Sequence, residues 1–328
     1  MDHRTVPARG VWLFPDASAP VMVGHAVQAE RLGLDAWWLG DEGPARDPFS
    51  VLAAAAMATS RIRLAVGIAN PYSRHPGLTA TTAHTVHELS GGRFVLGLGA
   101  GGDMALGPFG LHADAPLSAI RRAVRIARAV GARESTEGYE PQGCSVYDDG
   151  SIARLPVYVG ARGRLLNTLA SEVADGAFVA GIPPLLYPDV IGWVRSKRPV
   201  KVALYPSVAF GAEDADKVRA QMIWALMNAP DATRQSLGLD DPNLAAAATA
   251  LRTGDEAPAR RIMTDELLAK VLVLGSPADV GAQLAQLVTE HHPDEIGLAL
   301  GSSDVTRSQE QAAEAFEAMA GVLTGAAA

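Results

Sequence analysis

Short apolar runs alternate with longer stretches of helical periodicity along the whole chain, and this alternation restricts the fold more than any other feature. The strand-length runs are Val11–Phe14, Ala36–Leu39, Arg63–Ile68, Phe94–Leu98, Val157–Val159, Ala177–Ala180, Val200–Val208 and Ile296–Leu300. Continuous apolar strands separated by helices indicate a parallel sheet that is covered on its outside. Eight such units favour a closed (β/α)8 TIM barrel over an open sheet.

The length of 328 residues fits one such barrel with insertions, because a barrel of this kind takes about 250 residues. We therefore predict a single domain over residues 1–328. Two segments break the alternation and are predicted to be insertions, at about 134–154 and 213–290. The second is far too long for one helix, and we expect it to cover one side of the barrel mouth.

Charge and cysteine usage narrow the class of protein. The formal net charge of −8 argues against nucleic-acid binding and against a polybasic membrane anchor. No apolar run reaches the roughly 18 residues of a membrane span, and residues 1–10 lack the apolar stretch of a signal peptide. The single cysteine, Cys144, excludes an intramolecular disulfide. We expect a cytoplasmic protein that acts on a small molecule.

Polar or small residues follow several of the predicted strands, and in a TIM barrel these loops form the active-site mouth. Asp41 and Glu42 end the second run. They are read either as carboxyls held at the mouth for acid–base work or as a polar cap on a buried strand. The loop after Val157–Val159 opens a helix and carries Arg162 and Arg164, which is typical of an anion site. Solvated arginines in a short loop are the alternative.

Glycines mark two further strands. Gly67 interrupts an apolar strand near its end, which indicates a bulge or a close backbone approach. Gly97, Gly99 and Gly102 match G-x-G-x-x-G, but the glycines and proline that follow predict that no helix starts at once, unlike a dinucleotide-binding loop. We interpret this segment as a strand-end loop whose backbone approaches a flat ring.

Several motifs together carry a resemblance to a known family. They are Asn70-Pro71 with Arg74-His75-Pro76, Leu89-Ser90-Gly91-Gly92-Arg93 with Gly97-Leu98-Gly99, Ala174-Asp175-Gly176, and Leu274-Gly275-Ser276-Pro277. With these motifs the chain resembles the luciferase-like monooxygenase superfamily over nearly its whole length. More narrowly, it looks like the branch that depends on the deazaflavin coenzyme F420, which includes methylenetetrahydromethanopterin reductase.

The resemblance implies a role for each matching position. Asp41 would contact the deazaflavin ring, a cis peptide between Gly67 and Ile68 would back it, and Asn70 would also belong to the cofactor site. Ala100 and Gly101 would touch the cofactor from the next loop. The residues around its phosphate would be Gly160, Ala161, Gly163, Arg164 and Leu166. Family members also lead us to expect a homodimer.

Two departures from the sugar-phosphate dehydrogenases of this branch bear on the chemistry. Glu42 stands where they have histidine, and Gly102 stands where they have glutamate. We therefore predict that Glu42 or Asp103 carries the proton transfer. The predicted function is hydride transfer between F420 and an organic small molecule. The alternatives are an FMN-dependent monooxygenase and a non-catalytic flavin-binding protein of the same fold.

Other residue types with chemical potential are assigned no role. His84 and His87 lie three apart on one predicted outer helix, away from the mouth, so no metal site is predicted. Cys144 has no neighbouring histidine to activate it as a nucleophile. The tryptophans Trp12, Trp38 and Trp224 are candidates for the substrate wall, with burial in the core as the alternative.

Overall fold

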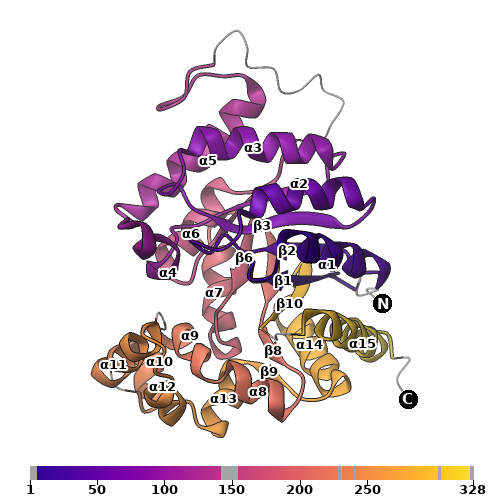
Figure 1. Cartoon of the computed structure of the whole chain (residues 1–328), viewed down its shortest axis with the longest axis vertical. Helices are drawn as coiled ribbons and strands as arrows, with labels where there is room; N and C mark the ends of the chain where they lie inside the picture. Colours follow the sequence, from indigo (N-terminus) through magenta and orange to yellow (C-terminus); the bar gives the residue numbers. More distant parts are fainter. Residues whose placement is uncertain are drawn as a thin grey trace.

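The computed structural model describes residues 6–141, 154–227, 229, 231–239, 241–301 and 304–325, without the side chains of Asp103, Met104, Ala232 and Asp241. Its centre is one sheet in which every pairing of the described strands is parallel. The strands are β1 (Ala8–Leu13), β2 (Ala36–Leu39), β3 (Arg63–Ala69), β4 (Phe94–Leu98), β5 (Val157–Gly160), β6 (Gly176–Ala180), β7 (Lys201–Tyr205), β8 (Ser207–Ala209), β9 (Val273–Leu274) and β10 (Glu295–Leu300). Because β1 pairs with both β2 and β10, the sheet closes into the predicted (β/α)8 barrel (Figure 1).

The seventh predicted strand is interrupted at Pro206. Proline has no backbone N–H to donate to a neighbouring strand, so the run divides into β7 and β8. The last strand, β10, follows both halves: its start pairs with β7 and its end pairs with β8. The short β9 then pairs with β8. The strands β8 and β9 therefore extend the sheet beyond β7, and most of the predicted large insertion lies between them in the sequence.

Outer helices surround the barrel in the order that the alternation predicts. They are α1 (Ala19–Arg31), α2 (Pro48–Ala58), α3 (Pro76–Leu89), α5 (Pro116–Ala132), α6 (Arg164–Val173), α7 (Tyr187–Val194), α14 (Pro277–His291) and α15 (Val305–Thr324). Proline at the first turn starts many of them, since its fixed φ suits a helix start and its missing N–H is not needed there. Ser276 and Asp279 form a capping box on α14.

The alternating directions of strand side chains separate two packed layers. Trp37 points outward into the large core between barrel and helices, whereas Trp38 points inward. The inner layer contains alanines and aromatic rings, among which Trp38 stacks on Phe178 with ring centroids 4.1 Å apart. Trp38 was a candidate for the substrate wall, with burial in the core as the alternative. It is wholly buried in the barrel interior and is therefore a core residue.

A buried carboxylate closes the end of the barrel at which the strands begin. Glu295, the first residue of β10, accepts hydrogen bonds from the Trp38 indole at 2.8 Å and from the Tyr205 hydroxyl, and it pairs with Arg63. A charge in the interior is tolerable only when it is paired and hydrogen-bonded. This end is therefore filled, and the opposite end remains as the mouth.

The large insertion is a helical unit with a core of its own. It contains α8 (Ala212–Val218), α9 (Ile223–Met227), α10 (Asp231–Ser236), α11 (Asp241–Arg252), α12 (Ala257–Ile262) and α13 (Asp265–Val271). Figure 1 shows these helices gathered to one side of the barrel. Their apolar side chains form a cluster separate from the main core. The predicted range 213–290 extends further than this unit, because its last residues form α14, which packs on α15 as an outer helix.

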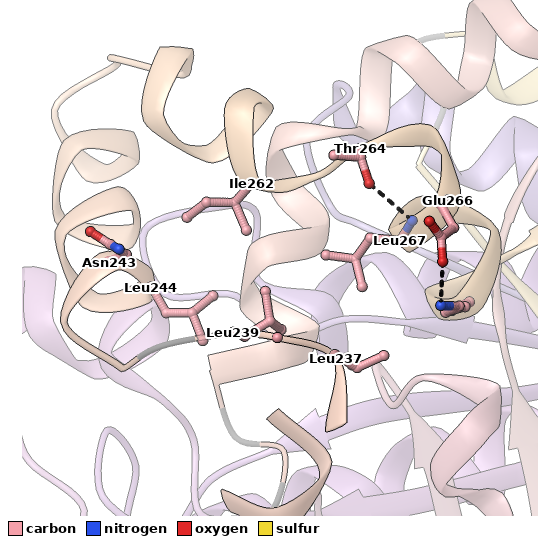
Figure 2. Close-up of a pocket in the computed structure, with 10 residues that line it drawn as sticks. Leu237, Leu239, Asn243, Leu244, Ile262, Thr264, Glu266 and Leu267 are labelled. Atoms are coloured by element: carbon pink, nitrogen blue, oxygen red, sulfur yellow. Dashed lines mark hydrogen bonds and ion pairs between the residues drawn. The ribbon is translucent and has the colours of Figure 1, made fainter. Parts of the chain in front are cut away.

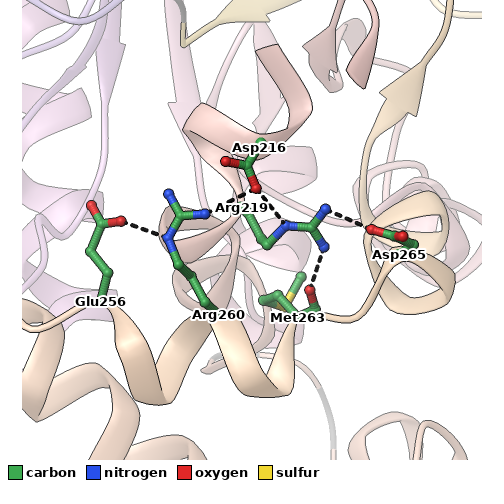
Figure 3. Close-up of polar contacts among 6 residues, drawn as sticks. All are labelled: Asp216, Arg219, Glu256, Arg260, Met263 and Asp265. Carbon is green, nitrogen blue, oxygen red and sulfur yellow. Dashed lines mark hydrogen bonds and ion pairs between the residues drawn. The ribbon is translucent and has the colours of Figure 1, made fainter. Parts of the chain in front are cut away.

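An ion-pair network ties the ends of the insertion together. Arg219, which follows α8, bonds to Asp216, to Asp265 of α13 and to the Met263 carbonyl oxygen (Figure 3). Arg260 of α12 bonds to the same Asp216 at 3.0 Å. Most of these carboxylates are exposed, so each pair contributes little alone. Together they fix which helices of the insertion are neighbours.

Of the first insertion, predicted at 134–154, only the two ends are described. A single antiparallel bridge joins Thr136 and Tyr139. Cys144 and the predicted turn at 148–150 lie outside the described residues. Before this segment, the arginines of α5 form exposed ion pairs, such as Arg121 with Glu172 at 2.7 Å.

Candidate functional site

The predicted site residues lie in the last part of β2, β3, β4 and β5 or in the loops that follow, so the barrel places them at the end where these neighbouring strands finish. Asp41 lies two residues after β2. It lines a cleft of about 810 Å³ together with Asn70 and Arg74, and the cleft continues outward between α2 and α3. Its size is that of a small-molecule site.

Burial raises the pKa of Asp41 to about 6; the Asp47 carboxylate adds to this, and the Arg74 guanidinium opposes it. Arg74 is itself held between the two outer helices. It donates to the Thr82 hydroxyl at 2.9 Å, and its guanidinium lies 5.4 Å from the centre of the Phe49 ring. Asp41 therefore changes charge closer to neutral pH than an ordinary aspartate.

Glu42 has the more strongly shifted carboxyl. Burial raises its pKa to about 7; the positive charge of Arg162 acts against this and the charge of Asp41 adds to it. Its side chain packs over Gly40, where an added Cβ would lie 3.1 Å from the Glu42 Cγ and 2.9 Å from the Trp12 ring. A carboxyl with a pKa near 7 at a barrel mouth is suited to giving or taking a proton.

The peptide bond between Gly67 and Ile68 is cis, as the resemblance predicted. The Trp12 indole N–H donates to the Gly67 carbonyl oxygen at 2.6 Å. Gly67 also lies against the inner aromatic layer, since a Cβ there would come within 2.7 Å of Trp38. The strand register shifts between Val66 and Ala69, so both expectations for this glycine, a bulge and a close approach, are met.

The glycines of β4 and β5 make room for a side chain rather than leaving a bare backbone surface. A Cβ at Gly99 would lie 1.9 Å from Ile68 Cδ1, and one at Gly97 or Gly160 would also crowd Ile68. Ile68 thus covers Gly97 and Gly99 on the side where a Cβ would stand, and the interpretation that this loop brings its backbone close to a ring stays a prediction. Gly102 is different, because no described atom lies within 4 Å of its ideal Cβ position.

The turn after β3 depends on Asn70. This buried side chain accepts hydrogen bonds at its Oδ1 from the backbone N–H of Tyr72 at 3.0 Å and of Ser73 at 2.9 Å. Its carbonyl oxygen is thus used to shape the loop that leads to Arg74. Asn70 stays a predicted cofactor residue, and it lines the cleft beside Asp41.

The loop after β4 holds the remaining candidates on this side. Ala100 and Gly101 are both half-buried, and Gly101 has φ +70°, which favours glycine. A one-turn helix, α4 (Asp103–Leu106), begins directly afterwards, contrary to the prediction that no helix starts at once. The Asp103 side chain lies outside the described part of the structure, so its role as a proton donor stays a prediction.

The predicted phosphate residues surround the start of α6. Gly163 is the N-cap residue and provides no side-chain cap, so the first-turn N–H groups have no such partner. Arg164 begins the helix with an exposed side chain, and no described atom lies near the ideal Cβ position of Gly163. Ala161 and Leu166 are half-buried in the same loop and first turn. These features fit a bound phosphate.

Sequence reasoning missed Asn167. Its buried Nδ2 donates to the carbonyl oxygens of Ala161 at 3.1 Å and Gly163 at 3.0 Å, which braces the loop from behind. An asparagine at the first turn of a helix that follows a glycine-rich loop is the only signal that the sequence offers for it.

A second cavity, of about 290 Å³, lies inside the insertion between α10, α11, α12 and α13. Leu239, Leu244, Ile262 and Leu267 form its apolar walls, with Thr264 at one side (Figure 2). None of its lining residues is one of the predicted site residues. We therefore place the candidate active site at the barrel mouth.

The histidines behave as structural residues. His87 is buried and its ring Nδ1 contacts the Phe94 carbonyl oxygen at 3.0 Å, and His84 contacts the Ala127 carbonyl oxygen at 3.1 Å. Among the residues that the structure describes, no cluster of histidine, cysteine or carboxylate side chains could hold a metal ion. Nor is any of the described helices long and apolar enough to cross a membrane.

Comparison with known proteins places the chain in a family. The model of the luciferase-like monooxygenase family matches residues 6–291. The chain belongs to this family. It is 29% identical over 298 residues to 5,10-methylenetetrahydromethanopterin reductase of Archaeoglobus fulgidus, covering 85% of this chain and 89% of that protein. For the enzyme of the same name from Methanolobus tindarius the identity is 27% over 293 residues, covering 85% and 90%.

Solved structures share the family fold. The coenzyme F420-dependent tetrahydromethanopterin reductase of Methanopyrus kandleri superposes with a TM-score of 0.78 at 23% identity, covering 94% of this chain and 98% of that one. An F420-dependent secondary alcohol dehydrogenase gives a TM-score of 0.72 at 15% identity, covering 96% and 99%. The fold is thus a luciferase-like (β/α)8 barrel, as predicted.

Proposed function

We propose that this family member is an oxidoreductase that transfers a hydride between coenzyme F420 and an organic small molecule. The observation that carries the proposal is Glu42, a carboxyl with a pKa of about 7 on the loop beside the predicted ring site. Relatives that match most of the chain are named as methylenetetrahydromethanopterin reductases, whose solved counterpart is described as F420-dependent, and this supports the choice of cofactor.

The residues present fit the cofactor at both ends. The uncapped start of α6 and Arg164 would hold its phosphate, and Asn167 keeps that loop in shape. Asp41, which lines the cleft, would contact the polar edge of the ring, and the half-buried Ile68 would lie behind the ring. The bound cofactor supplies the hydride chemistry, and the protein supplies position and electrostatics.

A proton must move with the hydride wherever a substrate or ring heteroatom would otherwise be left charged, and Glu42 would be the residue that holds it. At neutral pH a carboxyl with this pKa is present in both protonation states, so it can act in either direction of the reaction. Asp103 is the second candidate for this step. The insertion would form one wall for the substrate, with Trp12 and Trp224 as candidate contacts. The proposal also includes a cytoplasmic location and a homodimer. Light scattering would test the homodimer.

Direct competition tests the cofactor. The cofactor-free protein is equilibrated with equal concentrations of F420 and FMN and then desalted, and the retained cofactor is identified by its absorbance. We expect F420. Retention of FMN alone would overturn the choice and favour the monooxygenase alternative, whose structural relatives include the monooxygenase RslO1 from Streptomyces bottropensis.

Two substitutions then separate binding from chemistry. Asp41→Ala should weaken F420 binding, because it removes a predicted ring contact. Glu42→Gln should bind F420 normally but lose about 10²–10⁴-fold in turnover, which is the usual contribution of a general acid or base. If Glu42→Gln and Asp103→Asn both retain full turnover, neither residue carries the proton. Binding without turnover of any substrate class would favour the non-catalytic alternative.

A further inference from the structure

Asn167 holds two carbonyl oxygens of the loop between β5 and α6. Its Nδ2 donates to the Ala161 oxygen at 3.1 Å and to the Gly163 oxygen at 3.0 Å. The Gly163 oxygen also accepts the backbone N–H of Asn167 at 3.2 Å. Because the asparagine side chain is fully buried, both carbonyls are turned toward the inside of the protein.

The direction of these carbonyls fixes the direction of the neighbouring N–H groups. In a planar trans peptide the C=O and the N–H that follows it point in opposite directions. The peptides after Ala161 and Gly163 are both trans. The backbone N–H groups of Arg162 and Arg164 are therefore aimed away from Asn167. The Arg164 group is also a first-turn donor of α6, for which Gly163 offers no side-chain cap.

An asparagine is not the side chain that packing alone would favour at this position. Its Oδ1 is buried and has no hydrogen-bond partner among the described residues, which costs free energy. Turning the amide over would set Oδ1 against the two carbonyl oxygens, so only the orientation with Nδ2 toward the loop is favourable. A polar side chain that keeps one end unpaired is expected where a local geometry serves function.

The two arginines of this loop contribute differently. The Arg162 guanidinium turns to the insertion, where its Nη1 donates to the Trp224 carbonyl oxygen on α9 at 3.2 Å. The Arg164 side chain is exposed at the helix start, and no described atom lies within 4 Å of the ideal Cβ position of Gly163. An anion at this opening would meet two backbone N–H groups and one guanidinium.

We propose that Asn167 is a positioning residue that turns the backbone N–H groups of Arg162 and Arg164 toward the phosphate of the bound cofactor. The inference rests on the proposed function in so far as the mouth takes a cofactor that carries a phosphate. The bonds of the Asn167 amide lie within the protein and need no ligand. The phosphate contact is therefore formed before the cofactor enters, which lowers the cost of ordering the loop.

The test compares ligands with and without a phosphate, which separates a lost phosphate contact from a general loss of structure. Fluorescence titration measures the affinity for F420 and for the matching deazaflavin that ends in a ribityl chain without phosphate. Asn167→Leu keeps a side chain of similar size and should bind F420 about ten- to hundredfold more weakly, the usual weight of a hydrogen bond to a charged group. Its affinity for the phosphate-free deazaflavin should be unchanged.

The matched control is Ser171→Ala. Ser171 is buried one turn further along α6, and its hydroxyl donates to the Thr168 carbonyl oxygen at 2.7 Å, away from the loop. Both affinities of this variant should match those of the wild type. Asn167→Ala, which adds no bulk, repeats the comparison if the leucine does not fit.

Amide NMR gives the second readout. In protein labelled with ¹⁵N-arginine, Arg162→Lys and Arg164→Lys identify two backbone signals. Both signals should shift when F420 binds to the wild type, and should shift much less when the phosphate-free deazaflavin binds. Signals that respond equally to the two ligands would overturn the proposal, because the N–H groups would then not meet the phosphate.

The affinities decide the role of Asn167 itself. Equal losses for both ligands in Asn167→Leu overturn the proposal, because the residue would then support the mouth as a whole, and an unchanged F420 affinity overturns it as well. If the competition experiment returns FMN, the proposed cofactor fails, and the comparison is made with FMN and riboflavin, which differ by one phosphate. A selective loss for FMN would then support the positioning role, so the two proposals fail separately.

Discussion

The Trp12 indole donates its N–H to the main-chain carbonyl oxygen of Gly67 across 2.6 Å, and so ties β1 to β3 at the mouth. The same ring limits the space at Gly40, beside Glu42. Trp12 therefore contacts Gly67, next to the predicted ring site, and Gly40, next to the predicted proton carrier Glu42. Its role is to hold two neighbouring loops in a fixed relation, whichever substrate enters.

This bond gives a prediction for stability. Trp12→Phe keeps an aromatic ring but leaves the Gly67 carbonyl without its donor, so we expect a loss of about 1–3 kcal/mol in the free energy of unfolding. Trp224→Phe is the matched control, because its buried indole N–H has no hydrogen-bond partner in the described structure. Urea denaturation of both variants measures the difference. Equal losses would show that ring size, and not the hydrogen bond, matters.

The raised pKa of Glu42 predicts how stability depends on pH. The folded-state pKa of about 7 lies above the ordinary 4.5, so the folded state holds the extra proton and stability falls as pH rises from about 4.5 to 7. Relative to Glu42→Gln, the wild type should lose roughly 2 kcal/mol across this window, since one pKa unit corresponds to about 1.4 kcal/mol and water still reaches part of the carboxyl.

Denaturation curves of both proteins at several pH values measure this difference. Glu30→Gln is the control of opposite sign: backbone N–H groups of residues 60–62 hold the pKa of Glu30 at about 2, so its contribution is lost only as pH falls below about 4.5. A wild-type stability that rises from pH 5 to 7 relative to Glu42→Gln would contradict the assignment.

The start of α6 gives a third prediction. Arg164→Glu should weaken F420 binding by about ten- to hundredfold, because it replaces a charge-assisted contact to phosphate by repulsion. The unfolding free energy should barely change, since the side chain is exposed. Arg31→Glu makes the same change of charge at the far end of α1, and its affinity should match the wild type in a fluorescence titration. An affinity loss shared by both variants would point to net charge alone.

Much of the fold could be predicted because the apolar runs are short, buried and regularly spaced. The positions of Ala36–Leu39 and Phe94–Leu98 as strands follow directly from this pattern. The division at Pro206 was missed because apolar residues stand on both sides of it in Val200–Val208, although the missing proline N–H was visible in the sequence. The predicted end of the insertion at 290 includes α14, which follows the insertion helices as one more helical stretch.

The site was predictable as a set of loops but not as a set of contacts. Ile68 fills the space beside Gly97 and Gly160, on two other strands, and beside Gly99, which follows β4, and nothing in the sequence joins these positions. The contact of Arg162 with Trp224 spans 62 residues and uses a backbone carbonyl, so no residue type signals it. Pairings of this kind depend on the closed barrel, which brings residues together that are far apart in the sequence.

The break at Pro206 has a consequence for how such a chain can evolve. All the predicted cofactor residues come from residues 41–166, whereas the helical unit with its own core begins after β8 and ends before α14. Recombination that exchanges this one continuous segment would replace the predicted substrate wall while leaving the predicted cofactor residues untouched. If the insertion is the substrate wall as proposed, exchange of this segment would change the substrate range, and the bond between Arg162 and the Trp224 carbonyl oxygen marks a junction that an exchanged segment must fit.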